Sequence, residues 1–149
     1  MIKLLSILTL LSLVLIASAE QKTVDQLKAE AEHVEPGQQG RLYAEIAEKL
    51  VAVADKQFTD AESVKGHATV QEILQYATKA HDRAIETRKK MKETEKSLRE
   101  CHRRLENMKR TLAAEDRPRV EAVEKELEKL TEEVLESMFA PPSKKKDHK

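Results

Sequence analysis

The chain has 149 residues, of which 36% are charged and 3% aromatic, and its formal net charge at pH 7 is zero. With no Trp and only three Gly, this composition is typical of long helices and argues against a β-sheet protein. A neutral chain with so few aromatic residues for stacking on bases also argues against a nucleic-acid-binding protein.

Residues 1–19 have the pattern of a signal peptide. Lys3 supplies a positive charge, residues 4–16 are apolar apart from Ser and Thr, and Ala17-Ser18-Ala19 forms a cleavage site before Glu20. The apolar run is shorter than the roughly 20 residues that a spanning helix needs. We predict cleavage after Ala19 and export, to the bacterial periplasm or to the extracellular space. The alternative is an uncleaved membrane anchor.

Hydrophobic periodicity predicts four helices in the mature chain. Pro36 and Gly37 end the first helix, because Pro removes a backbone donor and Gly tolerates turns. Thr59 precedes Glu62 by three residues, which is the spacing of a capping box, and Asp116 is a suitable cap for the last helix. The predicted helices cover residues 23–34, 40–58, 61–113 and 117–139.

Residues 61–113 carry a heptad pattern, which is typical of a helix that packs along a coiled-coil seam. A continuous helix over this range would be about 80 Å long, and its least apolar stretch, residues 87–94, is the expected bend. The helix over 117–139 is too short to cover such a seam along its whole length. We therefore predict a self-association seam formed by Met91, Leu98, Cys101, Leu105, Met108 and Leu112.

The fold class that follows is all-α: antiparallel helical hairpins built around one long heptad-patterned helix, in an elongated bundle or coiled coil. Residues 81–113 contain 11 basic and 6 acidic residues, whereas residues 114–140 contain 4 basic and 9 acidic residues. The acidic last helix is therefore expected to lie beside the basic segment and to neutralise it. Residues 141–149 form a basic tail that we predict to be disordered.

Two resemblances accompany this pattern. Leu42-Tyr43-Ala44, the turn at Ala61 and Tyr76-Ala77 resemble a tetratricopeptide-type helix pair, of which the chain accommodates one unit, whereas solenoids need about three. The signal peptide, the hairpin, the long charged helix and the Asp116-Arg117-Pro118 break together resemble a family of exported bacterial all-helical proteins of unknown function. That resemblance implies no particular activity.

No catalytic or metal-binding residue is predicted, and no cofactor. The five histidines lack the i, i+4 spacing of a helical metal site, and the carboxylate pairs lie in polar surroundings. The single cysteine, Cys101, is on the seam, where it either fills the core or bridges two chains by a disulfide. The residues that could bind a polyanion are Arg88, Lys89, Lys90, Arg103 and Arg104.

The function predicted from these features is a non-enzymatic exported scaffold or protein-interaction module of the bacterial envelope. Its partner is another envelope protein or a second copy of the chain, with or without a disulfide through Cys101. One alternative is a periplasmic holdase that uses Met91, Met108 and Met138 for adaptable contacts with clients. A weaker alternative is a polyanion-binding protein.

Overall fold

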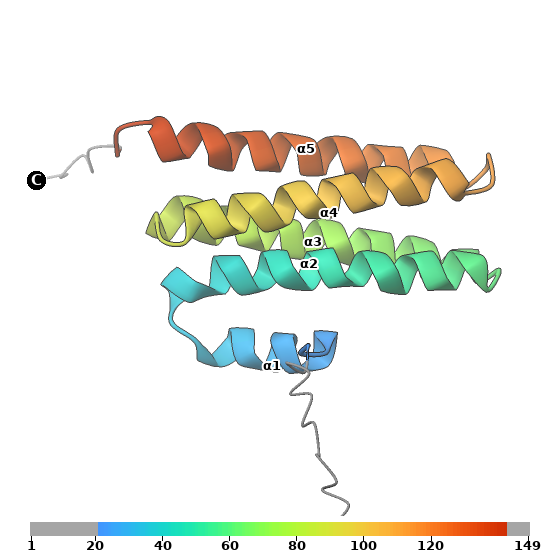
Figure 1. Cartoon of the computed structure of the whole chain (residues 1–149), viewed down its shortest axis with the longest axis horizontal. Coiled ribbons are helices and arrows are strands. Elements are labelled where there is room, and N and C mark those ends of the chain that lie inside the picture. The colour runs from blue at the N-terminus through green and yellow to red at the C-terminus, as the bar shows by residue number, and fades with distance from the viewer. Residues whose placement is uncertain (1–20, 143–149) are drawn as a thin grey trace, which may run out of the picture.

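The computed structural model describes residues 21–142, and within this range the chain is helical and contains no strand. The all-α fold class is confirmed. The predicted signal peptide and most of the predicted tail lie outside the described residues. The helices, shown in Figure 1, are α1 (Val24–His33), α2 (Pro36–Thr59), α3 (Ser63–Thr87), α4 (Met91–Thr111) and α5 (Arg117–Phe139).

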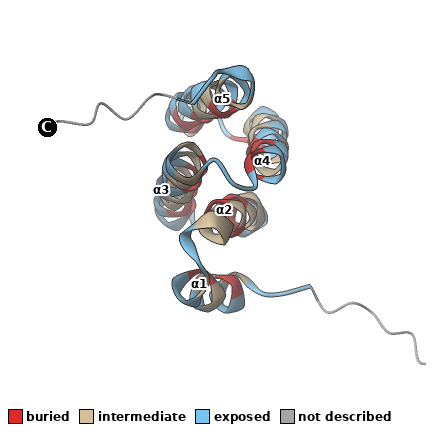
Figure 2. Ribbon diagram, turned by 90° about the vertical axis from the view of Figure 1, so that its left-hand side faces the viewer, coloured by how far each residue is buried: buried red, intermediate tan, exposed pale blue. Residues whose placement is uncertain are grey.

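Helices α2 to α5 form a four-helix bundle in which each helix runs opposite to the one before it (Figure 1). Viewed end-on, α2 and α5 occupy opposite corners, and α3 and α4 occupy the other two (Figure 2). As expected from the short loops, α2 packs on α3 and α5 packs on α4. Helix α1 lies against the outside of α2 and does not reach α4.

The predicted long helix over 61–113 is two helices, because the chain reverses completely at residues 88–90. Arg88 and Lys90 both adopt the left-handed conformation, with φ of 54°, which ends α3 and begins α4. The reversal buries the apolar stripes of both halves in one bundle, which a straight helix could not do. It falls within the stretch 87–94 where the sequence predicted a bend, but it is a turn between antiparallel helices.

Hydrogen bonds satisfy the backbone at this turn. The backbone N–H of Arg88 donates to the carbonyl of Ala84 at 2.9 Å and so caps the end of α3. The Arg88 guanidinium donates to the carbonyl oxygens of Ser137 and Ala140, at 2.9 and 3.0 Å, at the end of α5. Arg88 therefore ties the turn to the last helix as well as ending α3.

Two other helix boundaries differ from prediction. Helix α2 begins at Pro36 rather than near residue 40, because Pro is favourable at the first helical position, where no N–H donor is required. Helix α3 begins at Ser63, and the capping box between Thr59 and Glu62 does not form. The bounds of α5 are those predicted for residues 117–139.

Small residues bring α2 and α3 close together. A Cβ atom added to Gly40 would lie 3.2 Å from the carbonyl oxygen of Ala80 and 3.3 Å from the backbone nitrogen of Ala84. Ala77, Ala80 and Ala84 are all fully buried on the α3 side. Larger side chains fill the rest of the core, where each fully buried leucine contributes about 1.5–3 kcal/mol.

Candidate functional site

The predicted self-association seam lies inside the bundle. None of its six side chains is more than 8% exposed, and Leu98, Cys101 and Leu105 are fully buried. Helices α2 and α5 pack on either side of α4 and cover these residues. The prediction that they form a surface for a second copy is therefore wrong for the folded chain, because its own helices already occupy the seam.

The predicted polyanion residues do not form one patch. Arg88 is engaged with the end of α5, and the aliphatic stem of Lys89 lies against Gly37. Arg103 and Arg104 lie about 20 Å further along α4, at 1.5 Å of rise per residue. The structure thus separates the basic turn from the basic middle of α4.

Few basic side chains of α4 pair with acidic α5. Among residues 21–142, the ion pairs that join α4 to α5 involve Lys109 and His102, which lie 2.5 and 3.7 Å from carboxylate oxygens of Glu124. Arg104 instead pairs with Glu48 of α2 at 3.3 Å. The expectation that the last helix neutralises the basic segment is therefore wrong for most of that segment.

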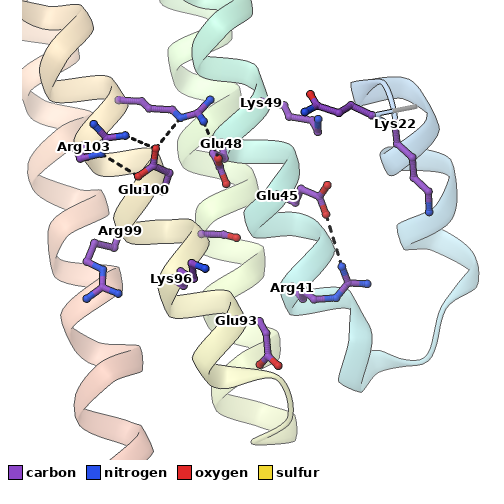
Figure 3. Close-up of a pocket in the computed structure, with 13 residues that line it drawn as sticks. Lys22, Arg41, Glu45, Glu48, Lys49, Glu93, Lys96, Arg99, Glu100 and Arg103 are labelled. Carbon is purple, nitrogen blue, oxygen red and sulfur yellow. Dashed lines mark hydrogen bonds and ion pairs between the residues drawn. The ribbon is translucent and has the colours of Figure 1, made fainter. Parts of the chain in front are cut away.

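Charged side chains of α2 and α4, together with Gln21 and Lys22 before α1, line a trough on the surface of the bundle (Figure 3). This trough has a volume of about 720 Å³, and seven basic and four acidic side chains surround it. Its lining residues are Gln21, Lys22, Arg41, Glu45, Glu48, Lys49, Glu93, Lys96, Ser97, Arg99, Glu100, Arg103 and Arg104.

Two carboxylates of the trough have shifted pKa values, for opposite reasons. Hydrogen bonds from Arg103 and then Arg104 lower the pKa of Glu100 to about 2. Burial raises the pKa of Glu48, an effect that the charge of Arg104 partly offsets. The trough therefore contains one carboxylate whose ionised form is strongly favoured and one whose ionised form is disfavoured by burial.

Not every cation of the trough is paired. Arg41 lies 3.7 Å from Glu45, and Arg103 and Arg104 share Glu100. Among residues 21–142, Lys49 and Lys96 form no ion pair with a carboxylate, and both line the trough. Figure 3 shows Lys96 on α4 and Lys49 on the side of α2 that faces α1. The trough can accordingly offer positive charge to a bound group without first breaking an internal pair at these two lysines.

The histidines that the sequence left unassigned fasten α5 to the bundle. The Nε2 atoms of His67 and His81 lie 2.8 Å from carboxylate oxygens of Asp116 and Glu133, respectively. Ser63 also donates to Asp116, at 3.2 Å. Sequence spacing could not reveal these pairs, since their partners are about 50 residues away in the chain.

The remaining reactive group is inaccessible. Cys101 is fully buried, and burial raises the pKa of its thiol, which disfavours the nucleophilic thiolate. Within the described part of the chain, no group of three or more His, Cys, Asp or Glu side chains is arranged to hold a metal ion.

Large exposed hydrophobic side chains are few over residues 21–142. They are Val53, Val64, Leu135 and Phe139, which are spread over α2, α3 and α5. Of the methionines expected to contact clients, Met91 and Met108 are buried and Met138 is partly buried. The described surface therefore lacks the adaptable apolar area that motivated the holdase alternative.

The fold and the trough define a four-helix bundle with an added N-terminal helix and a charged surface groove. Comparisons with protein-family models, with curated proteins and with solved structures find no match for the chain. In residues 21–142, the helices are too short or too polar for any of them to span a membrane.

Proposed function

We propose that this chain is a non-enzymatic, exported helical module that binds another protein of the bacterial envelope through the trough. One observation carries the proposal: seven basic side chains from α2, α4 and the segment before α1 gather around a single opening, with two lysines unpaired among the described residues. Charged and polar groups on a rigid scaffold give such a surface specificity and orientation for a partner.

Export is part of the proposal and rests on residues 1–19, which have the n-region, apolar run and cleavage site of a signal peptide. Cell fractionation and N-terminal sequencing of the mature protein test this part. A chain that begins at Glu20 and is recovered from the periplasm or the medium agrees with the proposal. A full-length chain in the membrane fraction would contradict cleavage.

The binding part is tested by site-specific photocrosslinking in the native envelope. A photoreactive residue replaces Ser97, which lines the trough, or Ala122, which is exposed on α5. We expect a discrete adduct with one protein from position 97 and none from position 122, with the partner identified by mass spectrometry. Equal labelling at both positions, or none at position 97, would refute the trough as the binding surface.

A further inference from the structure

We propose that the partner presents an acidic helix, which lies in the trough along α4 and pairs with Lys49, Lys96 and Arg99. This inference rests on the proposed function, because it names the chemistry of the partner at the same surface. It is carried by the distribution of charge around the trough and by the helices that form its walls.

The available positive charge lies on both walls of the trough. Lys49 projects from α2, and Lys96 and Arg99 project from α4, as Figure 3 shows. Lys49 and Lys96 form no ion pair among the described residues, and Arg99 is 66% exposed and 3.5 Å from Glu95. In Figure 3, Lys49 lies on the α1 side of α2 and Arg99 lies on the side of α4 that faces away from α2. An acidic helix that lies over the open face of α2 and α4 can therefore place carboxylates near cations of both helices.

The acidic residues of the trough argue for a protein helix over a uniform polyanion. Glu45 and Glu93 stand among the basic side chains, and each would repel a ligand that is negative along its whole length. A partner helix can place its own lysines or arginines next to these two glutamates, while its carboxylates pair with the basic side chains of the trough. The trough also contains no aromatic side chain on which a base or a sugar could stack.

The helical walls also suit a helical occupant. Helices α2 and α4 are neighbours in the bundle and run in the same direction, so the surface between them is a groove along two helix axes. A helix can lie along such a groove parallel to both axes. Its contacts there would be polar and ionic, because only Gln, Lys, Arg, Glu and Ser side chains line the trough. Helix α1 lies on α2 without reaching α4, which leaves this side open.

The test uses two synthetic helical peptides of equal length, one with an acidic and one with a basic charged face. Binding to the mature chain, residues 20–149, is measured by fluorescence anisotropy at low and at moderate salt. We expect the acidic peptide to bind, the basic peptide not to bind, and added salt to weaken the complex. Equal binding of both peptides, or no binding of the acidic one, would overturn the inference.

Charge-reversal variants locate the binding. Lys49→Glu combined with Lys96→Glu is expected to lower the affinity for the acidic peptide by about tenfold or more, because attraction becomes repulsion at two contacts. The matched control, Lys125→Glu with Lys129→Glu, makes the same change in net charge on the exposed side of α5 and should leave the affinity nearly unchanged. Lys49→Arg with Lys96→Arg should retain binding. Equal losses in the trough variant and the control would overturn the inference.

A heparin fragment serves as the uniform polyanion. The inference predicts that heparin binds more weakly than the acidic peptide, and tighter trough-dependent binding of heparin would overturn it in favour of a polyanion. The two proposals fail separately. If position 97 crosslinks to one partner while the acidic peptide does not bind, the trough remains a binding surface and the acidic helix is refuted.

Discussion

At the scale of single residues, Glu100 is a half-buried carboxylate whose pKa is strongly lowered. Arg103 donates to it through Nε at 2.9 Å, and Arg104 does so at 3.0 Å. These bonds favour the ionised form, and they lower the pKa of Glu100 from its ordinary value of 4.5 to about 2. Since Arg104 also pairs with Glu48, this cluster connects α4 to α2 across the trough.

The depressed pKa of Glu100 makes stability depend on pH in one window. A carboxylate whose pKa is lower in the folded state stabilises the fold above about pH 4.5, and this contribution is lost as the pH falls toward about 2. Glu100→Gln removes the titrating group. The free energy of unfolding of this variant should therefore decline less steeply than that of the wild type as the pH falls from about 4.5 toward about 2. The difference is expected to be small, since solvent screens exposed ion pairs.

Urea denaturation of both proteins at several pH values across this window measures the two slopes. Glu106→Gln is a suitable control, because Glu106 pairs with Arg110 on the same helix and, among residues 21–142, makes no ion pair with α2. Parallel declines for wild type and Glu100→Gln would contradict the assigned role of the two arginines.

At the scale of elements, the sequence predicted most helices because apolar spacing and proline positions are local signals. Residues 117–139 were predicted to the residue, since Pro118 is in the first turn and Pro141 follows the end. The predicted cap at Asp116 does not form, because its carboxylate bonds His67 and Ser63 instead of the helix backbone. The reversal at residues 88–90 was not predicted as such, because this turn contains neither Gly nor Pro. The heptad spacing also continues unbroken across it, so periodicity alone could not separate α3 from α4.

The left-handed turn gives a direct prediction for Lys90. Lys90 has a left-handed backbone, which costs a residue with a side chain about 1–2 kcal/mol. Glycine adopts this conformation freely, but its greater entropy in the unfolded chain lowers the free energy of unfolding by about 0.5–1 kcal/mol. Lys90→Gly should therefore be neutral or stabilise the protein by up to about 1.5 kcal/mol. The comparison is Lys129→Gly in the exposed interior of α5, which should cost about 0.5–1 kcal/mol.

Chemical denaturation of the two variants decides whether the chain turns here. Both replace an exposed lysine with glycine, so charge and size change equally. If Lys90→Gly destabilises the protein as much as Lys129→Gly does, residue 90 lies within a regular helix and the reversal is refuted.

At the scale of the whole molecule, the same apolar stripe can serve a dimer or a single chain. The heptad positions of 61–113 are what two associating helices would need, and composition cannot distinguish the two uses. The reversal at 88–90 decides between them, because it lets α2, α3 and α5 surround the stripe of α4. The trough was likewise beyond sequence reasoning, since its residues come from segments that only the folded bundle brings together.

The buried stripe predicts that the mature chain is a monomer. Analytical ultracentrifugation over a wide range of protein concentration should give a single species of one-chain mass, with and without reductant, because Cys101 is fully buried and its seam is at most 8% exposed. A reductant-sensitive dimer would mean that α4 leaves the bundle to meet a second chain.

The burial of Cys101 also predicts how fast its thiol reacts. A thiol reagent should label Cys101 slowly in buffer and rapidly in denaturant, and the rate in buffer should follow global opening of the bundle. Rapid labelling of the native monomer would mean that α2 or α5 detaches readily, and the trough, whose walls are α2 and α4, would then be a transient surface.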